Sequence, residues 1–109
     1  MREITCSTIT DAIKKMCIEA ATILPQDVEK ALSQKHDEED SALAKKTLQV
    51  LMDNAKLAQE KQMPICQDTG MAFVYVTMGQ EVHITGGSLN EAIQEGVRQG
   101  YTEGYLRKS

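Results

Sequence analysis

Apolar residues recur at three- and four-residue spacing through the first half of the chain, a pattern that predicts helices. A first helix is expected over about residues 8–24. A short second helix is expected after Pro25, because proline suits the first helical position. A third helix, over about residues 41–62, should end before Pro64, which disfavours helical geometry in the residue that precedes it.

The hydrophobic pattern changes after residue 70. Residues 71–77 are apolar at nearly every position, which is typical of a strand covered on both faces. Residues 81–85 alternate between apolar and polar side chains, and residues 78–80 form a turn signal between the two stretches. The pattern therefore predicts a β-hairpin in which His83 lies on the exposed polar side.

The last stretch of the chain predicts another helix. Ser88 and Glu91 have the spacing of a capping box at a helix start. Inside this helix, glycines repeat at four-residue steps, each disfavoured by about 1 kcal/mol relative to alanine; they are Gly96, Gly100 and Gly104. A stripe without side chains indicates close packing against another element, with a cofactor-bearing loop as the alternative neighbour.

The predicted fold class is therefore α+β, with a helical N-terminal half followed by a β-hairpin and a C-terminal helix. A chain of 109 residues can form one hydrophobic core, so residues 1–109 are expected to be a single domain. The final residues contain neither a glycine cap nor a proline stop after the last helix. We accordingly expect the chain to be a fragment of a larger domain.

Composition narrows the classes of function. The net charge is −4 and basic residues do not cluster, so nucleic acid is not an expected partner. No apolar run approaches the roughly 20 residues that span a bilayer, so no membrane association is expected. The start of the chain lacks the pattern of a signal peptide, which makes the cytoplasm the expected compartment. Three cysteines in such a chain favour reduced thiols or metal ligation over disulfides.

The stretch of residues 64–70, PICQDTG, carries the candidate chemistry. It lies between the third helix and the apolar run, in a loop of the kind that often presents reactive groups. Cys66 is the thiol that stands beside polar groups there, so it is the candidate metal ligand or nucleophile. Cys6 and Cys17 are interpreted as small buried or half-buried thiols, because Cys17 lies within an apolar stripe and Cys6 precedes it.

Residue chemistry leaves both roles of Cys66 open. A nucleophilic thiol needs a nearby base, whereas the neighbours of Cys66 are acidic or neutral. A metal ion would itself deprotonate the thiol, and the adjacent carboxylate would suit proton transfer. One cysteine is nevertheless an incomplete site, since an iron–sulfur cluster needs three or four ligands.

Three segments together extend this interpretation. The PICQDTG run of residues 64–70, the Gly-Gly pair at 86–87 and the terminal YLRKS of residues 105–109 resemble the amino-terminal part of iron–sulfur (class I) fumarate hydratases. The same pattern is similar to the α subunits of L(+)-tartrate dehydratase. The resemblance extends over essentially the whole chain.

The resemblance implies roles for four residues. Cys66 would be one of three protein ligands to a 4Fe–4S cluster. Gln67 and Asp68 would contact the substrate, with Asp68 as the catalytic group for proton transfer. Arg107 would bind a substrate carboxylate. The other two ligand cysteines would lie outside this chain, since Cys6 and Cys17 match no ligand position.

The activity implied is that of a hydro-lyase acting on a small C4 dicarboxylate. The reaction would convert fumarate to malate, a step of the tricarboxylic acid cycle, or tartrate to oxaloacetate. A β subunit, or a C-terminal domain of the same enzyme, would be the partner within an oligomer, and the isolated chain would be inactive. The alternatives are a non-catalytic interaction domain and a thiol enzyme with Cys66 as nucleophile.

Overall fold

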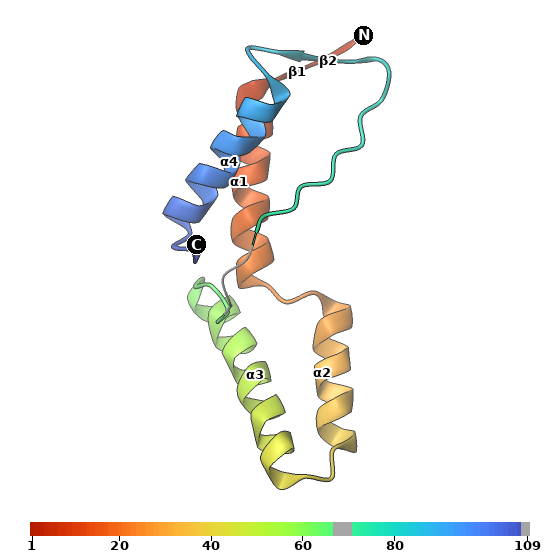
Figure 1. Cartoon of the computed structure of the whole chain (residues 1–109), viewed down its shortest axis with the longest axis vertical. Helices are drawn as coiled ribbons and strands as arrows, with labels where there is room; N and C mark the ends of the chain where they lie inside the picture. The colour runs from red at the N-terminus through yellow and green to blue at the C-terminus, as the bar shows by residue number, and fades with distance from the viewer. Residues whose placement is uncertain (67–70, 108–109) are drawn as a thin grey trace. The chain divides into compact units, whose positions relative to one another are not determined.

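The computed structural model describes residues 1–66 and 71–107. The chain divides into two compact units: a terminal unit of Met1–Glu19 with Asp68–Ser109, and a central unit of Ala20–Gln67. The elements follow the order β1 (Arg2–Thr5), α1 (Cys6–Thr22), α2 (Gln26–Glu38), α3 (Ala42–Lys61), β2 (Val82–Thr85) and α4 (Leu89–Glu103). Figure 1 shows them along the chain.

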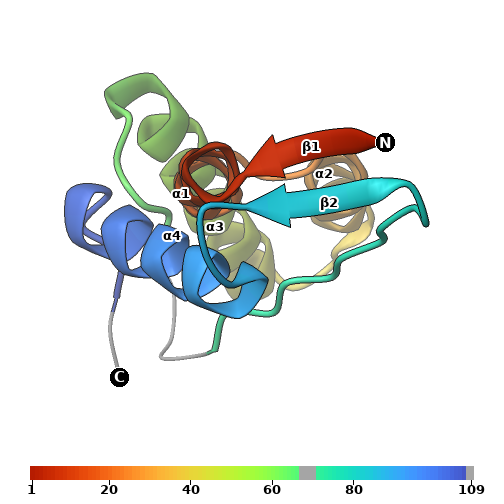
Figure 2. The same cartoon turned by 90° about the horizontal axis from the view of Figure 1, so that it is seen from above.

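A two-stranded parallel sheet and the helices that follow its strands form the terminal unit. β1 pairs with β2 in the register Arg2↔Val82 to Thr5↔Thr85, and both arrows point the same way in Figure 2. Each strand leads into a helix: β1 runs directly into α1, and β2 is joined to α4 by residues 86–88. The side-chain oxygen of Thr5 accepts the backbone N–H of Thr8 at 3.3 Å, as a helix cap does, so α1 begins two residues before its predicted start.

α4 lies along α1 at the positions of its glycines (Figure 1). A Cβ added at Gly96 would come within 2.6 Å of the Ile13 Cβ and 2.8 Å of the Thr10 carbonyl oxygen. One added at Gly100 would come within 2.9 Å of the Cys17 Cβ. The glycine stripe therefore serves close helix packing, as the first of its two interpretations predicted.

Polar contacts reinforce the packing of α4 on α1. The Thr10 hydroxyl donates to the Ala92 carbonyl oxygen at 2.9 Å. Lys14 Nζ lies 2.7 Å from Glu103 Oε2, and the bond to this carboxylate is the main cause that raises the pKa of Lys14. The predicted cap of α4 is present, since the Ser88 hydroxyl accepts the N–H of Glu91 at 3.4 Å.

The central unit consists mainly of α2 and α3, which lie side by side (Figure 1). The Ser41 hydroxyl accepts the N–H of Ala44 at 3.3 Å and so caps the start of α3. α3 ends at Lys61, where Gln62 takes the left-handed conformation with φ 55. The Met63 N–H then donates to the Ala58 carbonyl oxygen at 2.9 Å, the bond that closes many helix ends.

The predicted β-hairpin is wrong. Residues 71–77 form no strand, and they are exposed, with Phe73 at 72% and Tyr75 at 92%. A turn is present after them, where the Val82 N–H donates to the Gly79 carbonyl oxygen at 3.3 Å, but β2 pairs in parallel with β1. An apolar run indicates burial but does not specify a hydrogen-bonding partner. A strand forms only where its backbone pairs with another strand through a ladder of hydrogen bonds.

The predicted fold class is confirmed, but the expectation of no glycine cap after the last helix is wrong, because α4 ends at Glu103 with Gly104 as its C-terminal cap. The class is α+β, the first half is helical, and a helix follows β2. His83 lies on β2 with its side chain exposed, as expected. The single domain over residues 1–109 stays a prediction. Within residues 1–66 and 71–107, no helix has the length and apolar character to cross a membrane.

The glycine contact gives a first prediction. Gly96→Ala should lower the free energy of unfolding by about 1–3 kcal/mol, because the new methyl group overlaps Ile13 and the Thr10 carbonyl oxygen. This loss should exceed the gain of about 1 kcal/mol in helix propensity. Urea unfolding followed by circular dichroism measures the change.

Gly79→Ala is the matched control, because a Cβ there meets nothing within 4 Å. Its effect should stay within about 0.5 kcal/mol of zero. Equal stabilities of the Gly96→Ala chain and the parent chain would contradict the close approach of α4 to α1.

Candidate functional site

Cys66 lies in the central unit, in the segment 63–66 that follows α3. Its thiol is free and the residue is exposed, whereas Pro64 and Ile65 before it are half-buried. The left-handed residue Gln62 turns the chain at the end of α3, so the segment does not continue the helix axis. Because Pro64 and Ile65 are half-buried while Cys66 is exposed, this segment is suited to present Cys66 to a ligand.

Hydrogen bonds hold the backbone of this segment in place. Ile65 donates its N–H to the carbonyl oxygen of Ala21 at 2.7 Å, next to the end of α1. Cys66 donates its N–H to the side-chain oxygen of Asn54, on α3, at 2.9 Å. Pro64 has no N–H, so with the bond from Met63 to Ala58 every backbone donor of the segment is satisfied.

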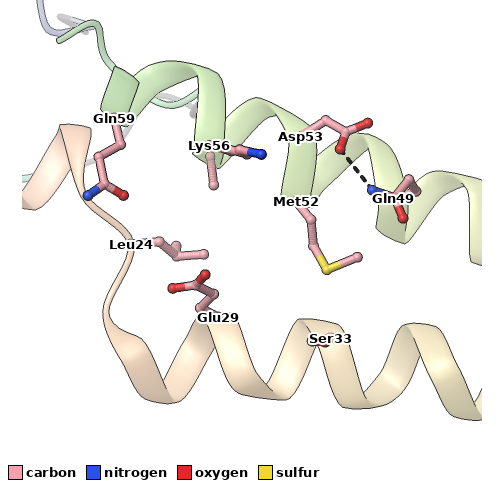
Figure 3. Close-up of a pocket in the computed structure, with 9 residues that line it drawn as sticks. Leu24, Glu29, Ser33, Gln49, Met52, Asp53, Lys56 and Gln59 are labelled. Carbon is pink, nitrogen blue, oxygen red and sulfur yellow. Dashed lines mark hydrogen bonds between the residues drawn. The ribbon is translucent and has the colours of Figure 1, made fainter. Parts of the chain in front are cut away.

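A cavity of about 320 Å³ separates α2 from α3 in the same unit (Figure 3). Glu29 from α2 and Met52 from α3 project into this space. Gln49 donates from its amide to Asp53 Oδ1 at 2.8 Å along one wall. Cys66 is not among the residues that line it, so this cavity is separate from the candidate site.

The other two cysteines serve packing in the terminal unit. Cys17 lies against Gly100, and burial raises the pKa of its thiol, so the thiol stays protonated at neutral pH. The Cys6 thiol donates to the Ser88 carbonyl oxygen at 3.7 Å and lies beside Gly87. Both are half-buried, which confirms the interpretation made from the sequence.

Of the other predicted site residues, the structure describes Arg107 but not Gln67 or Asp68. Arg107 is exposed and belongs to the terminal unit, directly after the buried Leu106. Leu106 donates its N–H to the Tyr101 carbonyl oxygen at 3.1 Å, which ties this turn to α4. Gln67 and Asp68 lie outside the described residues, so their roles stay predictions.

The donor chemistry of Cys66 fits an iron–sulfur cluster as one ligand. Its side chain is accessible, and thiolates are the donors that such clusters use. Across residues 1–66 and 71–107, no group of three or more His, Cys, Asp or Glu side chains could hold a metal ion. The described residues therefore supply one suitable ligand and no complete ligand set.

The contact of Asn54 with the loop could not be predicted from the sequence. An asparagine inside a predicted helix gives no sign that its side chain will reach a loop 12 residues later. The signal that could have been noticed is its modest helix propensity within a helix otherwise rich in Ala, Leu, Lys and Gln.

Comparison with known proteins matches residues 10–109 to the family described as fumarate hydratase (fumerase). A putative L(+)-tartrate dehydratase subunit alpha from Methanocaldococcus jannaschii is 37% identical over 100 residues, covering 91% of this chain and 35% of that protein. A putative fumarate hydratase class I from Geobacillus stearothermophilus is 32% identical, over 89% of this chain and 19% of that protein. The L(+)-tartrate dehydratase subunit alpha of Escherichia coli K12 is 27% identical, over 91% and 32%. The chain thus spans about a third or less of the length of these relatives.

The different surroundings of the cysteines give a second prediction. Iodoacetamide at neutral pH should modify Cys66 several-fold faster than Cys17, because Cys66 is exposed while the Cys17 thiol is half-buried and protonated. Peptide mass mapping over time measures both rates. The difference should vanish in denaturant, and faster modification of Cys17 in the folded chain would contradict the structure.

Proposed function

The chain belongs to the fumarate hydratase family, and from this premise we propose that it forms the amino-terminal part of an iron–sulfur hydro-lyase. The enzyme would add water reversibly to a C4 dicarboxylate, between fumarate and malate, or would dehydrate tartrate to oxaloacetate. The observation that carries the proposal is the exposed Cys66 thiol on a backbone held by Ala21 and Asn54, within the region that matches the family.

Each proposed site residue has a chemical role suited to its side chain. Cys66 holds a 4Fe–4S cluster through its thiolate, as one of three protein ligands. When bound, the cluster supplies a Lewis-acidic iron that polarises a substrate oxygen. Asp68 holds and moves the transferred proton at its carboxylate, and Gln67 contacts the substrate through its amide. Arg107 binds a substrate carboxylate with two parallel N–H donors of its planar guanidinium.

The names of the relatives support the proposed substrate class. Two relatives are named for tartrate and one for fumarate, and both molecules carry two carboxylates on four carbons. A guanidinium such as Arg107 recognises a carboxylate in either molecule, so it supports the dicarboxylate class without choosing between the two substrates.

The ligand count and the names of the relatives support the proposed partner. A cluster needs three or four protein ligands, and Cys66 is the one that this chain is proposed to provide. Two relatives are named as α subunits. We therefore propose that a longer α chain and a β subunit, or a C-terminal domain in its place, complete the enzyme in an oligomer. Residues 1–109 would be the amino-terminal portion of its α domain and inactive alone.

The cluster assignment gives a third prediction, for the assembled enzyme that contains this chain with the rest of its α subunit and its partner. Cys66→Ser should abolish both the 4Fe–4S absorption and hydratase activity, because one of the three ligands is lost. Anaerobic reconstitution, iron analysis and electron paramagnetic resonance measure the cluster directly.

Cys6→Ser and Cys17→Ser are matched thiol controls and should retain cluster and activity, since these side chains contact Ser88 and Gly100. The 109-residue chain alone should bind no stable cluster. A normal four-iron cluster in the Cys66→Ser enzyme would refute the assignment, and hydratase activity without iron would favour Cys66 as a nucleophile.

The substrate contact gives a fourth prediction. Arg107→Lys in the assembled enzyme should raise the Michaelis constant about tenfold, because lysine keeps the charge but loses one charge-assisted hydrogen bond of the planar pair. Steady-state kinetics with fumarate and with tartrate measure this change.

Arg98→Lys is the control, because Arg98 forms an ion pair with Glu95 on α4, which holds the pKa of Glu95 at about 2. The Michaelis constant of the Arg98→Lys enzyme should equal that of the parent enzyme. Unchanged kinetics of Arg107→Lys would remove Arg107 from the proposed site.

A further inference from the structure

We propose that Asn54 is the positioning residue for Cys66: its side-chain oxygen, 2.9 Å from the Cys66 nitrogen, fixes the backbone from which the thiol projects. The proposal rests on the proposed function in one respect, that Cys66 is a cluster ligand. The hydrogen bond itself is a property of the cluster-free chain.

The bond to Asn54 differs from the others that hold this segment. Met63 and Ile65 donate to the backbone carbonyl oxygens of Ala58 and Ala21, acceptors that most substitutions preserve. Cys66 donates to a side chain. The placement of Cys66 therefore depends on the identity of one residue outside the PICQDTG run.

The end of α3 explains how residues 12 positions apart come together. Asn54 precedes Lys61, the last residue of α3, by about two helical turns. The left-handed Gln62 then turns the chain, and the bond between Cys66 and Asn54 brings the segment back alongside α3. Cys66 is thus attached to the side of a regular helix rather than to a second loop.

Asparagine suits this position for two reasons. Its short side chain has few torsions to immobilise, so its carbonyl oxygen is a well-defined acceptor. It is also a modest helix former within α3, so the loop contact gives its presence a physical reason. Because the bond fixes the Cys66 backbone, it also limits the directions that the thiol can take toward a ligand.

The first experiment measures the hydrogen bond without a cluster. Amide hydrogen exchange of the 109-residue chain is compared between the parent and the Asn54→Ala, Asn54→Asp and Gln49→Ala variants. Asn54→Ala should speed exchange of the Cys66 amide by a factor on the order of ten, the size expected for one lost hydrogen bond. The Met63 and Ile65 amides should change little, because their acceptors are backbone oxygens.

Two variants separate positioning from a general loss of structure. Asn54→Asp keeps an acceptor oxygen at the same reach and should restore protection of the Cys66 amide. Gln49→Ala removes an amide side chain from the same helix, one that bonds Asp53 instead of the loop, and should leave Cys66 unchanged. Equal exchange of Cys66 in the parent and Asn54→Ala chains, or equal loss in Gln49→Ala, would overturn the proposal.

The second experiment connects the bond to the cluster in the assembled enzyme. The Asn54→Ala enzyme should lose cluster iron in air several-fold faster than the parent enzyme. Electron paramagnetic resonance and iron analysis measure the rate of this loss. Asn54→Asp should recover the parent rate. The same rate of iron loss in all three enzymes would show that Asn54 does not position the ligand.

Cys66→Ser in the same enzyme distinguishes the two possible failures. If Cys66→Ser loses the cluster while Asn54→Ala keeps it with parent stability, the proposed function stands and the role of Asn54 is refuted. If Cys66→Ser keeps the cluster, the proposed function fails. The exchange measurement then still decides whether Asn54 holds the Cys66 backbone.

Discussion

The terminal unit depends on how closely α4 can approach α1. At Gly96 and Gly100 the facing helix lies so near that a methyl group would overlap Ile13 or Cys17. Because dispersion forces decline steeply with distance, this approach brings backbone and side-chain atoms into contact that larger residues would keep apart. β1 precedes α1 and β2 precedes α4. The contact between the two helices therefore also brings together the two strands, which pair beside the amino-terminal ends of these helices.

The helical part of the fold was predictable because its signals are local. Apolar spacing and Pro25 indicated the helices of the first half, and the capping box at Ser88 indicated α4, which forms with that cap. The strands were less predictable because pairing is not local. β1 has four residues with Ile4 as its apolar position, too short for a periodic signal, and its partner β2 lies some 80 residues away.

The exposure of the apolar residues in 71–78 is explained by the small size of the sheet. Parallel strands usually have both faces covered, whereas β1 and β2 form a sheet of two short strands in which Arg2, Glu3 and His83 are exposed. Among the described residues no side chain is completely buried, and residues 74–78 border a cavity of about 430 Å³ beside the sheet and α1. The apolar pattern of residues 71–77 predicted a buried stretch, whereas in the structure these residues are largely exposed.

Residue chemistry and the resemblance suggest the candidate site, and the roles they give to its residues stay predictions. Cys66 is the candidate because its thiol stands among polar groups after a predicted helix end, and in the structure the residue is exposed. How the loop is held was not predictable, because nothing in the sequence links the two acceptors, Ala21 and Asn54, to residues 65 and 66. A thiol that must meet a ligand in one orientation needs a backbone with few conformations, and hydrogen bonds to the Ala21 carbonyl and the Asn54 amide restrict that backbone without adding charge. Because both acceptors are neutral, they restrict the Cys66 backbone without adding a charge that would act on a ligand at the proposed site.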